Sequence, residues 1–239
     1  MNRMFGTLKL DLRLQYRYGF YYAAAFITLL WIALLFTIPK PYLQVIVPLV
    51  IFTDLGVVGF YFIAGQILFE KSERTIYALL LTPLTFREYL ASKLASFSIL
   101  AWIISILVVT VSYGFEVDFL LLSLGIILTS IFFLLIGVIA VLPYQSISSF
   151  IIPSQLYIIV FYLPLIDYLG WFKSILFYLI PTQGSLVLLK AAFGGAGNTS
   201  LGQLIFAVFY MLIWIVGLIK IAQGQFEKHI TAGGRGGKK

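Results

Sequence analysis

The amino-acid sequence predicts an all-α polytopic membrane protein. Residues 119–166, forty-eight in a row, contain no Asp, Glu, Lys, Arg or His. Three shorter runs, residues 18–39, 94–115 and 191–219, also lack these residues. Each run is long enough for a helix that crosses a bilayer. Over the whole chain 62% of the residues are hydrophobic and 10% are charged, against roughly 25% charged residues in soluble domains.

We expect six transmembrane helices, because about 20 residues suffice for one crossing and the chain has 239 residues. The predicted spans are residues 21–38, 42–69, 94–112, 119–142, 149–168 and 201–221. Prolines mark two of the breaks, since Pro39 and Pro41 follow the first span and Pro143 follows the fourth. In this interpretation residues 1–239 form a single transmembrane domain.

Residues 2–18 are expected to form an N-terminal amphipathic helix that lies on the membrane surface. One side carries apolar side chains at helical spacing, and the adjoining side carries a basic stripe. The apolar residues are Met4, Phe5, Leu8, Leu12 and Tyr16, and the basic ones are Lys9, Arg13 and Arg17. A basic stripe of this kind suits the anionic headgroups of a membrane.

Between the fifth and sixth predicted spans, residues 172–180 and 184–193 are each too short to cross a bilayer. Pro181 and the residues after it separate the two segments. We therefore expect a short external helical pair within residues 171–195 that enters one interface and returns. The Gly- and Lys-rich residues 230–239 are expected to be a disordered tail.

The distribution of Lys and Arg predicts that both termini are cytoplasmic. With both termini inside, thirteen Lys and Arg residues lie on the inner side and three, Lys40, Lys173 and Lys190, lie on the outer side. Loops rich in Lys and Arg stay in the cytoplasm. Residues 70–92, which join the second and third spans, are therefore also predicted to be cytoplasmic.

Residues 70–92 are predicted to form a stiff, helical connection. Residues 70–81 can form a helix whose first turn carries acids, and Pro83 ends that helix. Thr85 and Glu88 then form a capping box that opens the helix leading into the third span. A force applied to this cytoplasmic connection would be transmitted to both spans.

The same segment resembles the membrane subunits of ABC-2 type exporters. The matching residues are Glu70, Glu73, Thr75, Leu79, Leu80, Thr82, Pro83, Thr85, Glu88, Tyr89 and Lys93. Arg74 departs from the pattern, because many members have glycine before the threonine. Among these exporters the chain looks most like fluoroquinolone-export permeases, on the strength of Pro181-Thr182-Gln183 and Phe226-Glu227-Lys228-His229.

The resemblance implies a permease subunit in the cell membrane of a prokaryote, with residues 70–92 as a cytoplasmic coupling helix. Two copies of a separate ABC ATPase subunit would bind ATP and Mg, and this chain would bind no cofactor. Two permease chains would pair, as a homodimer or with a homologous permease. A hydrophobic or amphipathic substrate, drug-like or lipid, would move outward by alternating access. The residues implied to couple to the ATPase are Glu70, Glu73, Arg74, Thr75, Leu80, Pro83 and Glu88.

Four residues are candidates for the substrate path: Asp54, Tyr61, Gln155 and Tyr157. A carboxylate at membrane depth costs about 2.5–3.5 kcal/mol unless it is paired, protonated or wetted. Asp54 therefore either contacts a cationic or polar substrate or hydrogen-bonds to a neighbouring helix. The other three residues follow from the resemblance, in which the second and fifth spans line the path.

Catalysis within this chain is not expected, and neither a metal site nor a nucleic-acid partner is predicted. The chain has no cysteine and one histidine, and no catalytic triad pattern appears. The glycines at 194–197 are not followed by the Gly-Lys-Ser/Thr of a phosphate-binding loop. Two alternatives remain: an ion-coupled secondary transporter that uses Asp54 for proton linkage, and a membrane assembly factor that transports nothing.

Overall fold

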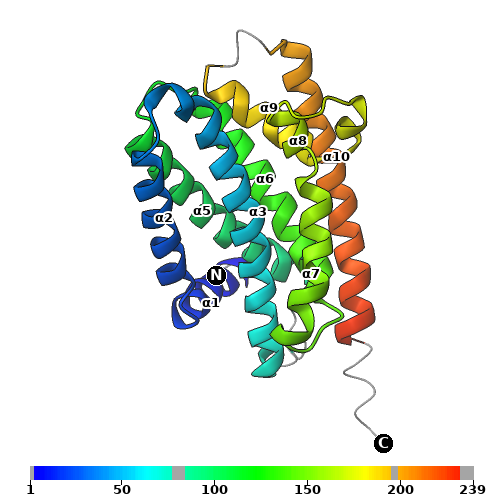
Figure 1. The fold of residues 1–239 in the computed structure, drawn as a ribbon. Helices are drawn as coiled ribbons and strands as arrows, with labels where there is room; N and C mark the ends of the chain where they lie inside the picture. Colours follow the sequence, from blue (N-terminus) through cyan, green and yellow to red (C-terminus); the bar gives the residue numbers. More distant parts are fainter. Residues whose placement is uncertain (1–2, 77–83, 195–198, 232–239) are drawn as a thin grey trace, which may run out of the picture.

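The computed structural model describes residues 3–76, 84–194 and 199–231, and every regular element in these ranges is a helix (Figure 1). The predicted all-helical class is therefore confirmed. In chain order the elements are α1 (Arg3–Arg17), α2 (Phe20–Phe36), α3 (Lys40–Ser72), α5 (Phe86–Ser112), α6 (Phe119–Val141), α7 (Ile147–Tyr162), α8 (Leu165–Tyr168), η1 (Ile175–Leu179), α9 (Thr182–Ala192), α10 (Leu201–Phe226) and η3 (Glu227–Thr231). Ile230, predicted to open the tail, is buried in η3.

Length and composition identify the helices that can cross a membrane. Four described helices, α3, α5, α6 and α10, meet both criteria. The pair α1 and α2, bent by 64°, gives a fifth candidate if it is counted as one broken span. α7 is apolar but has only 16 residues. The described helices thus define a multi-pass membrane protein with four or five span candidates, fewer than the six expected.

The predicted fifth span, residues 149–168, is divided into two helices. α7 ends at Tyr162 and α8 begins at Leu165. Pro164 lies between them and has no backbone N–H to donate, so the hydrogen-bond ladder of α7 does not continue through it. The segment is therefore two helices where the hydropathy pattern suggested one.

The start of α5 follows from local chemistry, as predicted. The Oγ1 of Thr85 accepts a hydrogen bond from the backbone N–H of Glu88 at 3.3 Å, and Oε2 of Glu88 accepts one from the backbone N–H of Thr85 at 2.9 Å. This capping box is confirmed. Because it starts the helix at Phe86, α5 extends well before the predicted span that begins at residue 94.

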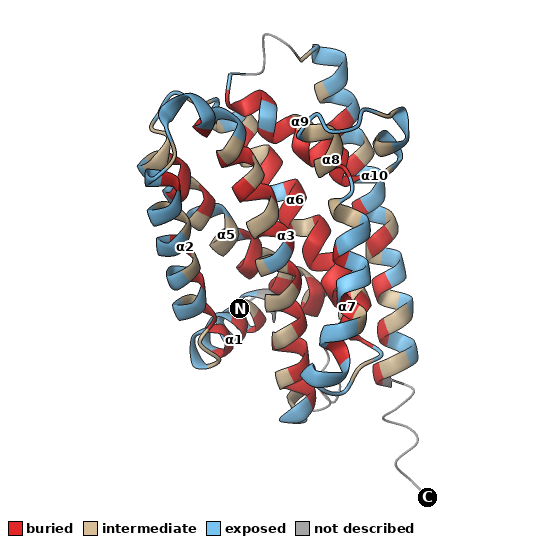
Figure 2. Cartoon of the chain, in the orientation of Figure 1, coloured by how far each residue is buried: buried red, intermediate tan, exposed pale blue. Residues whose placement is uncertain are grey.

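α6 is the central helix of the bundle. It packs against α3, α5, α9 and α10, and most of its residues are buried (Figure 2). The outer helices instead carry exposed apolar side chains, such as Phe26 on α2 and Phe209 on α10. Exposed apolar faces of this extent suit contact with lipid chains.

Two short elements between α8 and α10 lie at the end of the bundle opposite α1 (Figure 1). The first, η1, is a single 3-10 helix of five residues. The second, α9, packs between α6 and α10 and buries nearly all of its side chains. α9 is therefore part of the protein core, whereas the sequence indicated only a short interfacial helix.

α1 turns two different faces to its surroundings. Leu12 and Tyr16, on its apolar side, are exposed. Thr7, Asp11 and Gln15 lie four residues apart on another side and are buried, in the part of the bundle where α1 packs on α5. The buried face of α1 thus consists of these polar residues together with Leu14.

Candidate functional site

A buried ionic cluster joins α1, α3 and α5. The ammonium group of Lys93 lies between two carboxylates, 2.8 Å from Oδ1 of Asp11 and in direct contact with Oε1 of Glu70. The three side chains are 1%, 4% and 1% exposed for Lys93, Asp11 and Glu70. Burial of charges at this level is tolerated only when they are paired and hydrogen-bonded.

Neutral side chains complete the hydrogen bonds of both carboxylates. The amide of Gln66 donates to Asp11 at 2.9 Å and to Glu70 at 3.1 Å. The hydroxyl of Tyr89 donates to Glu70 at 2.8 Å, and the hydroxyl of Ser92 donates to Asp11. Every carboxylate oxygen therefore has a donor, which offsets the cost of removing two negative charges from water.

The last turn of α3 contacts two further elements. The ammonium group of Lys71 donates to the backbone carbonyls of Leu142 and Tyr144, at 2.6 and 2.7 Å. These carbonyls follow the C-terminus of α6, where a cation is favoured by the helix dipole. Lys71 therefore fixes α3 to the turn between α6 and α7.

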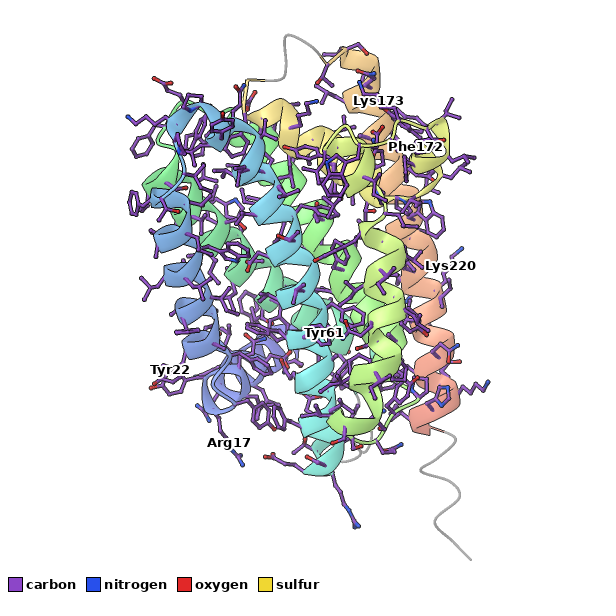
Figure 3. All side chains as sticks on the ribbon, in the orientation of Figure 1. Arg17, Tyr22, Tyr61, Phe172, Lys173 and Lys220 are labelled. Carbon is purple, nitrogen blue, oxygen red and sulfur yellow. The ribbon has the colours of Figure 1, made fainter. Side chains whose placement is uncertain are left out.

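Glu73, just after α3, binds the end of α1. Its Oε1 lies 3.1 Å from the guanidinium of Arg17, and its Oε2 accepts a hydrogen bond from the hydroxyl of Tyr18 at 3.0 Å. Burial, followed by the neighbouring Glu73 carboxylate, raises the pKa of Tyr18 to about 12. Tyr18 thus stays protonated at neutral pH and continues to donate to Glu73. Figure 3 shows Arg17 at this end of the bundle.

Arg74 occupies a backbone conformation that favours glycine. Its φ is 58°, in the left-handed region. A residue with a Cβ atom pays roughly 1–2 kcal/mol there. This conformation gives a physical reason for the glycine that many ABC-2 type sequences have before the threonine, and it marks the turn that ends α3.

The other predicted coupling residues are distributed around this turn. The hydroxyl of Thr75 donates to the backbone carbonyl of Glu70 at 3.1 Å, so it closes the turn. Glu88 belongs to the capping box of α5. Leu80 and Pro83 lie outside the described residues. Glu70 is buried in the cluster, so it holds the turn in place without presenting a surface to another subunit.

A second candidate region runs along the face of α3 between α2 and α7 (Figures 1 and 3). Tyr61 projects from α3 towards α7, where its hydroxyl accepts a hydrogen bond from the amide of Gln155 at 2.6 Å and lies 3.1 Å from the hydroxyl of Ser154. A groove of about 440 Å³ surrounds Tyr61 and Gln155. Tyr157 is 39% exposed and does not line this groove.

Asp54 lies in a separate groove between α2 and α3. The indole nitrogen of Trp31 on α2 donates to its Oδ1 at 3.0 Å. The groove has a volume of about 610 Å³, and its walls are otherwise almost entirely apolar. Val57, one turn from Asp54, lines both this groove and the one at Tyr61. The two grooves therefore meet along one stripe of α3.

The structure thus brings Tyr61 and Gln155 together, places Asp54 in the adjoining groove, and leaves Tyr157 apart. Sequence reasoning missed Asp11, although Thr7, Asp11 and Gln15 at intervals of four form a polar stripe on a helix expected to be amphipathic. It also missed Trp31 as the partner of Asp54. Among the described residues no group of three His, Asp or Glu side chains is arranged to hold a metal ion.

An apolar helix bundle with four or five span candidates and grooves along one helix defines a multi-pass membrane protein. The chain belongs to the fluoroquinolones export permease protein family, whose family model matches residues 2–233. It is 35% identical over 232 residues to fluoroquinolones export permease proteins of Mycobacterium tuberculosis strains CDC 1551 and H37Rv, covering 97% of this chain and 98% of each relative. No solved structure matches the chain. The resemblance to export permeases is therefore confirmed.

Proposed function

We propose that this chain is the membrane subunit of an ATP-driven ABC-2 type exporter that moves a hydrophobic or amphipathic compound outward. A separate ATPase subunit, in two copies, would bind ATP and Mg and push on the turn after α3. Two permease chains, identical or homologous, would form the path in the cell membrane of a prokaryote. Six crossings would come from α2, α3, α5, α6, the α7–α8 pair and α10, with both termini in the cytoplasm.

One observation carries the coupling part of the proposal. Glu70, Lys71 and Glu73 each bind a different neighbour of α3, namely the α1–α5 cluster, the α6–α7 turn and the end of α1. A displacement of this turn would be transmitted to several helices at once, since packed and ion-paired elements move together. A lever of this kind is what a motor subunit outside the membrane requires.

Charge reversal of Arg74 tests the coupling. Arg74 is exposed at the turn, and we expect Arg74→Glu to lower ATPase retention and substrate-stimulated ATP hydrolysis by roughly tenfold, the size of one lost charged contact of about 1.4 kcal/mol. The measurement is co-purification of an ATP-binding subunit with the tagged chain, followed by ATPase assay in proteoliposomes. Lys228→Glu, at an exposed site in η3, is the matched control and should change neither quantity. Transport by the purified chain without any ATPase would contradict the proposal.

The groove at Asp54 makes a separate prediction. If its carboxylate contacts a cationic substrate, Asp54→Asn should reduce transport of a cationic compound by roughly tenfold, because a hydrogen bond to a charged group contributes about 1.5–3 kcal/mol. Transport of an uncharged analogue should stay within about twofold of the wild type, since the amide keeps the shape of the groove. Trp31→Phe removes the indole N–H that donates to Asp54 and keeps the carboxylate of Asp54. It therefore separates loss of the hydrogen bond from loss of the charge.

Vesicle assays under two driving forces separate the competing explanations for Asp54. Equal transport of the cationic compound by Asp54→Asn and by the wild type would mean that the carboxylate only holds α2 to α3. Transport driven by a proton gradient alone, and lost in Asp54→Asn, would instead favour an ion-coupled transporter over the ATP-driven exporter.

A further inference from the structure

A buried amide oxygen at the end of the bundle opposite α1 has no hydrogen-bond partner in the part of the chain that the structure describes. Gln183 lies in the first turn of α9 and is 5% exposed. Its Nε2 donates to Oδ2 of Asp167 at 2.7 Å, whereas no donor among the described residues reaches its Oε1. Exchanging the amide oxygen and nitrogen would set the oxygen against the carboxylate, so Asp167 fixes the orientation. The oxygen is therefore an unsatisfied buried acceptor, and buried acceptors are nearly always paired with a donor.

Two adjoining cavities open at Gln183. Their volumes are about 240 Å³ and 260 Å³, and both are lined by Tyr178, Gln183, Val187 and Gln203. The first extends along α10 past Phe206 and Ala207 and is mainly apolar. The second is mainly polar, and its lining includes Asp167, Lys173 and Lys190. A single amphipathic molecule could fill both.

The charged residues at the polar cavity indicate which chemical groups the polar head of such a molecule would carry. Lys173 and Lys190 are exposed at its rim, and Figure 3 shows Lys173 at the end of the bundle far from Arg17. Two lysines favour an anionic group such as a phosphodiester. The acceptor at Gln183, next to Asp167, favours a head that also carries a hydrogen-bond donor. Membrane-spanning helices end at the depth where phospholipid headgroups lie.

We propose that these two cavities bind a phospholipid whose head carries both a phosphate and a hydrogen-bond donor, as phosphatidylethanolamine does. The phosphate lies between Lys173 and Lys190, the donor reaches Oε1 of Gln183, and the first part of an acyl chain occupies the apolar cavity beside Phe206. The site is separate from the grooves along α3 and does not depend on the coupling or the direction of transport.

The test compares lipids that differ in one feature at a time. The purified full chain in maltoside micelles is titrated with dihexanoyl phosphatidylethanolamine, with dihexanoyl phosphatidylcholine, which has no head donor, and with chain-free glycerophosphoethanolamine, using native mass spectrometry. We expect phosphatidylethanolamine to bind about fivefold tighter than phosphatidylcholine, because only its ammonium can donate to Gln183. The chain-free head should bind at least about tenfold more weakly, because it leaves the apolar cavity unfilled. Equal binding of the two lipids would overturn the head assignment, and equal binding of the chain-free head would overturn the lipid assignment.

Matched variants locate the binding. The double variant Lys173→Gln with Lys190→Gln should weaken phosphatidylethanolamine binding by about tenfold, whereas Lys40→Gln, at an exposed lysine that lines neither cavity, should not. Gln183→Leu should abolish the preference for phosphatidylethanolamine over phosphatidylcholine. Gln183→Leu also removes the hydrogen-bond partner of Asp167. The lysine variants leave Gln183 and Asp167 intact, so they test the site independently. Unchanged affinity in the double lysine variant would place any bound lipid elsewhere.

Discussion

Replacing Lys93 with methionine is expected to lower the free energy of unfolding by about 3–5 kcal/mol. The reason is that the buried carboxylates of Asp11 and Glu70 would lose the cation that they share. Methionine fills a similar volume, so the effect reports the charge and not a cavity. The measurement is chemical unfolding of the purified protein in detergent, followed by tryptophan fluorescence.

Two further variants separate the charge effect from a general one. Lys220→Met removes an exposed lysine from α10 and should change the unfolding free energy by less than about 0.5 kcal/mol. Adding Asp11→Asn and Glu70→Gln to Lys93→Met removes all three charges and should recover most of the loss, since a fully neutral cluster leaves no buried ion unpaired. A Lys93→Met protein as stable as the wild type would show that the cluster does not hold α1, α3 and α5 together.

The second large effect is expected at the contact of α3 with α6. A Cβ atom at Gly137 would lie 2.7 Å from the backbone oxygen of Phe60 and 2.7 Å from Cγ2 of Ile63. Small residues allow this close approach of membrane helices. Gly137→Ala should therefore destabilise the protein by about 1–3 kcal/mol, although alanine favours a helix. Thermal unfolding in detergent measures the change.

Gly217 on α10 provides the matched control for Gly137. It also lies within a helix, but a Cβ atom there meets nothing within 4 Å. Gly217→Ala should stabilise the protein by up to about 1 kcal/mol, through helix propensity alone. If the two alanine variants shifted stability in the same direction, the close approach of α6 to Phe60 would not require glycine at position 137.

The proposed coupling site combines residues that the sequence identified with residues that it did not. The capping box of Thr85 and Glu88 was predictable because both partners lie within one turn. The left-handed backbone conformation of Arg74 could not be predicted, although the sequence shows arginine where glycine is usual. Asp11 escaped notice because it binds Lys93, which is 82 positions away in the chain.

The division of the predicted fifth span has a similar explanation. Hydropathy registers the apolar composition of residues 149–168, and it does not register that Pro164 lacks the backbone N–H that a continuous helix needs. Likewise, the short apolar stretch that forms α9 could lie at an interface or in a core. Only the packing of α9 between α6 and α10 shows that it belongs to the core.

The sequence by itself determined the membrane class, the all-helical fold, the approximate position of the long helices and the start of α5. These properties depend on composition and on contacts within a few residues, because a bilayer requires apolar segments whose backbone bonds are satisfied internally. The tertiary structure alone decided which polar groups meet: Lys93 with Asp11 and Glu70, Trp31 with Asp54, and Tyr61 with Gln155. Polar groups inside an apolar bundle must find partners, and only the packing of helices distant in the chain decides which partners lie within reach.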